Sequence, residues 1–165
     1  MRLLDDIRAY LTRNPIIGVC LIYYLMMALA VPGFFSINNS WNLVYNLAPL
    51  LILAVGQTFV ILTAGIDLSI TSIIAVASVV GGYLMSSETT IFDNPTIAVL
   101  AGIIGMLAVG VTVGLVNGIS VAKLGMPAFM VTLTSLMFFS GLAIWITQSQ
   151  SIYNLPALLV DAPYR

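Results

Sequence analysis

The sequence predicts an all-α, polytopic helical membrane protein with about five transmembrane helices and a cytoplasmic N-terminus. Of its 165 residues, 61% are hydrophobic and 7% are charged, whereas a soluble domain carries about 25% charged residues. Apolar runs of about 20 residues recur along the chain, and a helix of that length crosses a hydrocarbon core of about 30 Å. Residues 1–165 are therefore expected to form a single transmembrane domain, with a lipid bilayer as their solvent.

The N-terminal part combines a charged segment with the first apolar run. Residues 1–13 carry five charges and are expected to form a short amphipathic segment on the cytoplasmic side. The first span is expected at residues 16–35, followed by a polar linker at residues 36–42, in which Trp41 suits the interfacial aromatic belt. The small residues at 28–30 also resemble a signal-peptidase site, so cleavage near the end of the first span stays an alternative.

Four further apolar runs complete the set of spans. Each is long enough to cross a bilayer, and polar residues, prolines or glycines separate it from the next. Pro49 is expected to free a backbone carbonyl near the start of the second span. These spans are expected at residues 43–64, 68–85, 96–122 and 127–147.

Basic residues set the predicted orientation. With five spans, the arginines of residues 1–13 and Lys123 fall on one side of the membrane, whereas Glu88, Asp93 and the tail at 148–165 fall on the other. This arrangement follows the positive-inside rule. The sequence therefore predicts a cytoplasmic N-terminus and a periplasmic tail.

The composition also argues against several function classes. The chain has no His and a single Cys, which removes Ser–His nucleophiles, His-based proton relays and Cys–His metal sites. No glycine-rich phosphate loop followed by Lys and Ser or Thr is present, and no basic patch suggests nucleic-acid binding. We therefore expect no enzyme activity, no metal or cofactor site and no nucleic-acid partner.

Asp67 is the most unusual residue of the apolar region. It stands between residues 14–66 and 68–87, two runs without a charged side chain, and an ionisable group at membrane depth is costly to keep. In a structural interpretation, Gly65 ends one helix in a left-handed conformation and Asp67 caps the next, with Ser69 as a local partner. In a functional interpretation, Asp67 lines or gates a path. The two interpretations are compatible.

Other uncharged polar residues mark a candidate polar seam. Asn46 and Gln57 are eleven residues apart, which places them within about 20° on one helix face. Such amides either join helices or bind a polar solute, and the same two interpretations apply to Asn117. Thr132 adds a hydroxyl that can also bond to its own helix backbone. The candidate residues for a substrate pathway or its gate are therefore Asn46, Gln57, Asp67, Ser69, Asn117 and Thr132.

Small residues recur at intervals of four in the span at residues 96–122. Such a register forms a groove that lets another helix backbone approach closely, so we expect it to pack against a neighbouring helix. Met106 interrupts the register. Its members are Ala98, Gly102, Gly110, Gly114, Gly118 and Ala122.

Four segments resemble a known family. Residues 56–69 (GQTFVILTAGIDLS) and residues 114–133 (GLVNGISVAKLGMPAFMVTL) are similar to two landmarks of sugar-importing ABC permeases of the ribose type, in the same order and at the usual separation. Residues 140–143 and 153–156 continue the match. Relatives that carry amino acids or nucleosides usually lack the GIDLS string, so the resemblance favours a sugar.

The resemblance implies a membrane-spanning permease subunit of an ATP-driven monosaccharide importer that works by alternating access. Its implied partners are an ATP-binding cassette subunit, a periplasmic sugar-binding protein and a second permease subunit. Members of the family are about twice as long as this chain, and the loop that docks on the ATP-binding subunit lies in their second half. The chain thus resembles an N-terminal half.

Two other functions stay open on the sequence alone. An ion-coupled secondary transporter would use Asp67 as its coupling site. A truncated, non-transporting membrane fragment would fold without binding an ATP-binding subunit or a sugar receptor.

Overall fold

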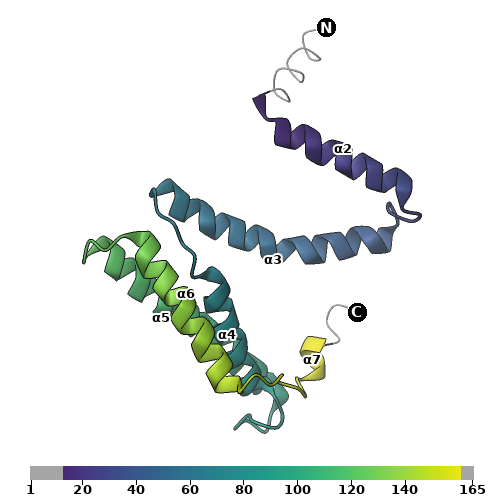
Figure 1. The fold of residues 1–165 in the computed structure, drawn as a ribbon. Helices are drawn as coiled ribbons and strands as arrows, with labels where there is room; N and C mark the ends of the chain where they lie inside the picture. The colour runs from purple at the N-terminus through teal and green to yellow at the C-terminus, as the bar shows by residue number, and fades with distance from the viewer. Residues whose placement is uncertain (1–12, 161–165) are drawn as a thin grey trace. The chain divides into compact units, whose positions relative to one another are not determined.

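The computed structural model describes residues 13–160, and its regular structure is helical throughout (Figure 1). No strand occurs in that range, so the prediction of an all-α chain is confirmed. The helices are α2 (Pro15–Ala30), α3 (Ile37–Leu62), α4 (Ile70–Met85), α5 (Pro95–Ala122), α6 (Ala128–Thr147) and α7 (Ala157–Val160).

Three of these helices, α3, α5 and α6, are long and apolar enough to cross a membrane. The apolar helices α2 and α4 have 16 residues each, about 24 Å at 1.5 Å per residue, which is less than a hydrocarbon core of about 30 Å. All five predicted spans are helical, but two of them over a shorter stretch than expected. The orientation and the single-domain organisation stay predictions. Most of the amphipathic segment, residues 1–12, and the end of the tail, residues 161–165, lie outside the described residues.

The boundary between α2 and α3 corrects the sequence-based prediction. α2 ends at Ala30 rather than at residue 35, and α3 begins at Ile37, within the stretch expected to be a linker. The Ser36 hydroxyl accepts a hydrogen bond from the backbone N–H of Asn39 at 3.3 Å, as helix-capping serines do. The polar residues after Ser36 therefore form the first turns of α3 instead of a loop.

Pro49 lies inside α3, and the helix continues through it. By its internal contacts the chain divides within α3, after Gly56. The first part contains α2 and most of α3. The second part contains the end of α3 and all later helices, and it holds the candidate site.

In the second part, α4 packs against α5 and α6, which also contact each other (Figure 1). At the α4–α5 contact, each helix places a methionine against a glycine of the other helix. A Cβ atom on Gly102 of α5 would lie 2.3 Å from the Met85 side chain of α4, and one on Gly81 of α4 would lie 2.1 Å from the Met106 side chain of α5. Met106, which interrupts the small-residue register in the sequence, is thus the residue that fills the notch at Gly81.

Ala98 of the small-residue register is also buried, at 1% exposure, whereas three later glycines are open. Among residues 13–160, an added Cβ on Gly110, Gly114 or Gly118 would meet no other atom within 4 Å. The predicted close helix contact therefore forms around Gly102, and it does not extend to the C-terminal half of α5 in this structure.

Candidate functional site

The site begins where α3 ends. The N–H of Gly65 donates to the carbonyl of Val60 at 3.0 Å, and the N–H of Ala64 donates to that of Ile61 at 2.9 Å, which is the pair of bonds of a Schellman cap. The left-handed residue of this cap is Ala64, with φ of 54°, so the prediction of Gly65 in that conformation is wrong. Gly65 instead lies at a tight contact, since a Cβ there would lie 3.2 Å from the Val60 side chain and 3.3 Å from the Val60 carbonyl.

Residues 65–69 then form a non-helical segment that leads to the start of α4. Side chains from two other helices bind the carbonyl groups of this segment. The Thr132 hydroxyl of α6 lies 3.1 Å from the Ile66 carbonyl and 2.9 Å from that of Ala128 in its own helix, so its one proton serves both. The Gln57 amide of α3 donates to the Asp67 carbonyl at 2.8 Å. Non-helical backbone at membrane depth needs such partners.

Asp67 braces the turn that leads into α4. Its Oδ1 accepts hydrogen bonds from the backbone N–H of Ser69 at 2.7 Å and from the Ser69 hydroxyl at 2.6 Å. Ser69 is itself the N-cap of α4, and its carbonyl accepts the first helical bond from Ile73. The predicted partnership of Asp67 and Ser69 is therefore present. Asp67 lies two residues before the N-cap, however, and does not bind the free amides of the first helical turn.

A chain of hydrogen bonds leads from α6 through α5 to the Asp67 carboxylate. The Ser135 hydroxyl donates to Asn117 Oδ1 at 2.5 Å, and Asn117 Nδ2 donates to the Ser69 hydroxyl at 3.0 Å, which in turn donates to Asp67. Ser69, Asn117 and Ser135 are at most 8% exposed. Every donor points towards the carboxylate, so the hydrogen bonds of the chain polarise one another in the same direction.

This network lies inside the helical bundle and not at its rim. Ser135 is seven residues beyond Ala128, the start of α6, which corresponds to about 10 Å along the helix at 1.5 Å per residue. The non-helical segment therefore follows the ends of α5 and α6 for about two turns before α4 begins. Ser72 adds a further buried contact, as its hydroxyl donates to the Ser69 carbonyl at 2.7 Å.

Most of the candidate pathway residues meet at this place. Asp67 and Ser69 belong to the non-helical segment, and Gln57, Asn117 and Thr132 each form a hydrogen bond to it. Asn46 does not: it belongs to the first part of the chain, is exposed, and its amide donates to the Asn42 carbonyl at 2.8 Å.

Two residues of the network, Ser72 and Ser135, are not among the predicted pathway residues. Both carry a spacing signal, because Ser72 lies three residues after Ser69 and Ser135 lies three residues after Thr132. Residues three apart share a helix face.

A hollow of about 220 Å³ opens beside the Asp67 carboxylate. Its lining includes Asn117 and Thr132 of the network and also Gly114 and Gly118, two members of the small-residue register. These glycines therefore border the candidate site in this chain rather than a second helix. Hydrogen-bonding groups and a half-buried carboxylate thus face an open hollow between the non-helical segment, the end of α3, α5 and α6.

Residues 39–158 match the family model described as "branched-chain amino acid transport system / permease component". The chain belongs to this permease family. It is 32% identical over 145 residues to the ribose import permease of Escherichia coli K12, 32% over 133 residues to the L-arabinose permease of Azospirillum brasilense, and 30% over 136 residues to the D-allose permease of Escherichia coli K12. The resemblance to ribose-type permeases is thereby confirmed.

The three matches cover 88%, 81% and 82% of this chain but 43%, 37% and 40% of the relatives. The chain thus spans less than half the length of the curated relatives it matches. Another relative, 34% identical, is named as an inner membrane ABC transporter permease. The family and the apolar helices together make the chain a multi-pass inner-membrane protein. No solved structure matches it.

Proposed function

We propose that the chain forms part of the membrane-spanning permease of an ATP-driven monosaccharide importer. The names of three relatives support this, because they are permeases for ribose, L-arabinose and D-allose. These relatives are transport proteins rather than enzymes, and their ATP-driven class is favoured over an ion-coupled transporter that would use Asp67. In this proposal the partners are an ATP-binding cassette subunit, a periplasmic sugar-binding protein and a second permease subunit.

The non-helical segment at residues 65–69 is the observation that carries the proposal. In the described part of the chain, the backbone N–H groups of Ile66, Asp67 and Leu68 donate no hydrogen bond, and the Ile66 side chain is 54% exposed. Irregular backbone at membrane depth is tolerated where it is buried in protein or lines a water-filled cavity. We infer that this segment borders the hydrophilic path, where its amides and the Asp67 carboxylate meet solute or water.

This arrangement suits a sugar as the solute. Each sugar hydroxyl is both a donor and an acceptor, as is any hydroxyl group. The free amides of the segment supply donors, and the second carboxylate oxygen of Asp67 supplies an acceptor. In many secondary transporters, a helix that starts inside the bundle likewise borders the binding site.

The same arrangement links the path to the rest of the bundle. Gln57 of α3, Asn117 of α5 and Thr132 of α6 each bind the segment or its first helical turn. A change in the spacing of α5 and α6 would therefore move residues 65–69. In the proposed mechanism, ATP binding and hydrolysis by the partner subunit supply that change, and the chain itself holds and releases the solute.

A chimera tests this function. This chain would replace the matching portion of the Escherichia coli ribose permease, in a strain that lacks its own ribose permease but keeps its partner subunits. We expect ATP-dependent ribose uptake above that of the empty strain. A chimera that reaches the membrane and binds the ATP-binding subunit, yet transports neither ribose, L-arabinose nor D-allose, would contradict the proposal.

A further inference from the structure

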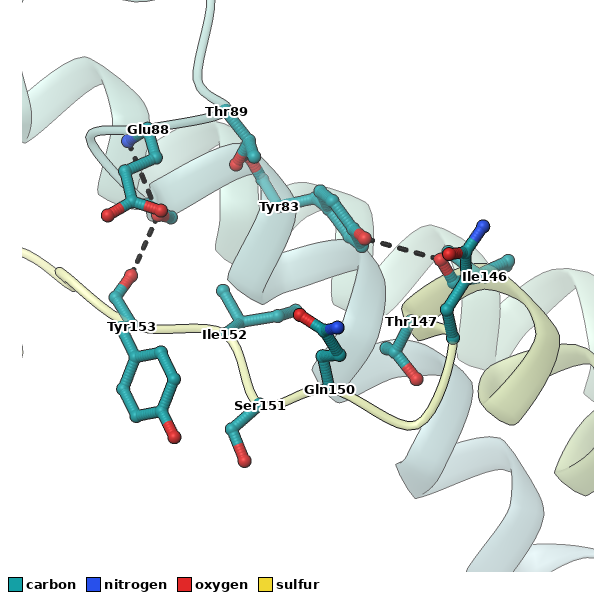
Figure 2. Close-up of a pocket in the computed structure, with 11 residues that line it drawn as sticks. Tyr83, Glu88, Thr89, Ile146, Thr147, Gln150, Ser151, Ile152 and Tyr153 are labelled. Carbon is teal, nitrogen blue, oxygen red and sulfur yellow. Dashed lines mark hydrogen bonds between the residues drawn. The ribbon is translucent and has the colours of Figure 1, made fainter.

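A second polar hollow, of about 300 Å³, lies at the other end of α4 from Asp67. It is formed by the end of α4, the end of α6 and the segment that follows α6 (Figure 2). That segment folds back over α4: the Ser86 hydroxyl donates to the Tyr153 carbonyl at 2.7 Å, and the Ser87 N–H donates to the Asn154 carbonyl at 3.1 Å. The Asn154 amide also donates to the Glu88 carboxylate.

Apolar contacts and one further hydrogen bond hold the walls in place. Ile152 packs on Gly82 of α4, where a Cβ would lie 2.8 Å from the Ile152 side chain. The Tyr83 hydroxyl donates to the Ile146 carbonyl at 3.3 Å and ties α4 to α6 (Figure 2). The hollow is thus a built feature of the fold, with contacts on each side that fix its shape.

Several lining groups keep hydrogen-bonding capacity. Within the described residues, the side chains of Gln150 and Ser151 bind no protein atom, and one Glu88 oxygen is already bound by Asn154 while the other is free. Figure 2 shows these side chains around the hollow, together with Ile152 on its wall. The hollow therefore offers an amide, hydroxyl groups and one carboxylate oxygen next to an apolar surface.

This chemistry selects a class of ligand. The lining contains no Lys, Arg or His, so nothing there offsets the charge of an anion such as a sugar phosphate. A neutral monosaccharide matches the donors and acceptors through its hydroxyls, and its C–H face matches Ile146 and Ile152. A volume of about 300 Å³ is at the lower end of the range for small-molecule sites.

We propose that this hollow binds a neutral monosaccharide, as the first contact of the solute with the permease. The assignment rests on the proposed function, and it adds a second site to it. Under the predicted orientation, Glu88 and residues 148–154 face the periplasm, the side from which an importer receives its solute. Sugar would then meet this hollow before it reaches the segment at residues 65–69.

Direct binding to the purified full chain in lipid nanodiscs tests the proposal. The probes are D-ribose, D-ribose 5-phosphate and D-glucosamine, measured by saturation-transfer NMR. We expect D-ribose to bind, with Gln150→Leu or Glu88→Gln weakening it about fivefold, as the loss of one hydrogen bond does. The matched control is Thr134→Val, an exposed hydroxyl near the other end of α6 whose partner is its own helix carbonyl.

A second measurement covers a variant that folds poorly. Ser151→Cys in a Cys20→Ser background should react with a water-soluble maleimide, and D-ribose should slow that reaction. The proposal is overturned if D-ribose binds equally to Gln150→Leu and Thr134→Val, if the phosphate or the amino sugar binds more tightly than D-ribose, or if D-ribose leaves the maleimide reaction unchanged.

The two proposals fail separately. Uptake by the chimera with no effect of Gln150→Leu on ribose binding would remove the second site and leave the permease role. Ribose binding that depends on Gln150, in a chain whose chimera does not transport, would support the second site and contradict the permease role.

Discussion

Replacing Asn117 by leucine should destabilise the chain because it removes the centre of the buried hydrogen-bond network. Asn117 bonds to Ser69 at 3.0 Å and to Ser135 at 2.5 Å, and it is 7% exposed. Hydrogen bonds between membrane helices contribute on average about 0.6 kcal/mol and at most about 1.7 kcal/mol each. Two such bonds predict a loss of about 1–2 kcal/mol.

Reversible unfolding in mixed detergent micelles measures this loss. Ser120→Ala is the matched control, because Ser120 lies on the same helix and its hydroxyl bonds to its own helix carbonyl of Val116. It should change the free energy of unfolding by less than about 0.5 kcal/mol.

A double-mutant cycle isolates the bond between Asn117 and Ser135. The double variant Asn117→Leu with Ser135→Ala should lose less stability than the sum of the single changes, by about 0.6–1 kcal/mol. Equal losses for Asn117→Leu and Ser120→Ala, or strictly additive effects in the cycle, would refute the reasoning.

Three further predictions follow from the same part of the chain. Ala64→Gly should raise the free energy of unfolding by about 1 kcal/mol, because Ala64 is left-handed with φ of 54° and glycine adopts that conformation without strain. A loss of stability in the same unfolding assay would contradict the assigned cap. Gly102→Leu should lower the free energy of unfolding by about 1–3 kcal/mol through overpacking against Met85. Gly110→Leu should not lower it, because an added Cβ at Gly110 has no described neighbour within 4 Å. Equal effects of the two changes would contradict the packing. In the chimera, Asp67→Asn should keep most ribose uptake, because its amide oxygen still accepts a hydrogen bond from Ser69. Asp67→Leu should lower ribose uptake about tenfold or more. Lower uptake by Asp67→Asn than by Asp67→Leu would contradict the bracing role.

Much of the bundle follows from the sequence alone. The α5 and α6 boundaries differ from the predicted ones by a single residue, since Pro95, Pro127 and the turn at residues 123–127 punctuate long apolar runs. The start of α3 was missed for a local reason. The polar composition of residues 36–42 is typical of a linker, but Ser36 caps a helix whose first turns are polar.

The network itself needed the tertiary structure. The bond between Asp67 and Ser69 is local and was predicted, whereas Asn117 lies 48 residues from Ser69 in the chain and reaches it only because α5 packs on α4. The prediction of a left-handed Gly65 rests on the intrinsic preference of glycine for that conformation. The register of the Schellman bonds placed it at Ala64 instead, and close approach to Val60 is what Gly65 provides.

Cysteine accessibility in native membranes tests most directly whether residues 65–69 border a hydrophilic path. In a Cys20→Ser background of the chimera, Ile66→Cys and Leu68→Cys would be treated with a membrane-impermeant maleimide in inverted and right-side-out vesicles, with Phe138→Cys, an exposed position of α6, as the reference. The account predicts that both segment positions react at least about tenfold faster than Phe138→Cys and that ribose slows them. Reaction rates equal to that of Phe138→Cys in both vesicle types would place the segment in lipid or sealed protein and contradict it.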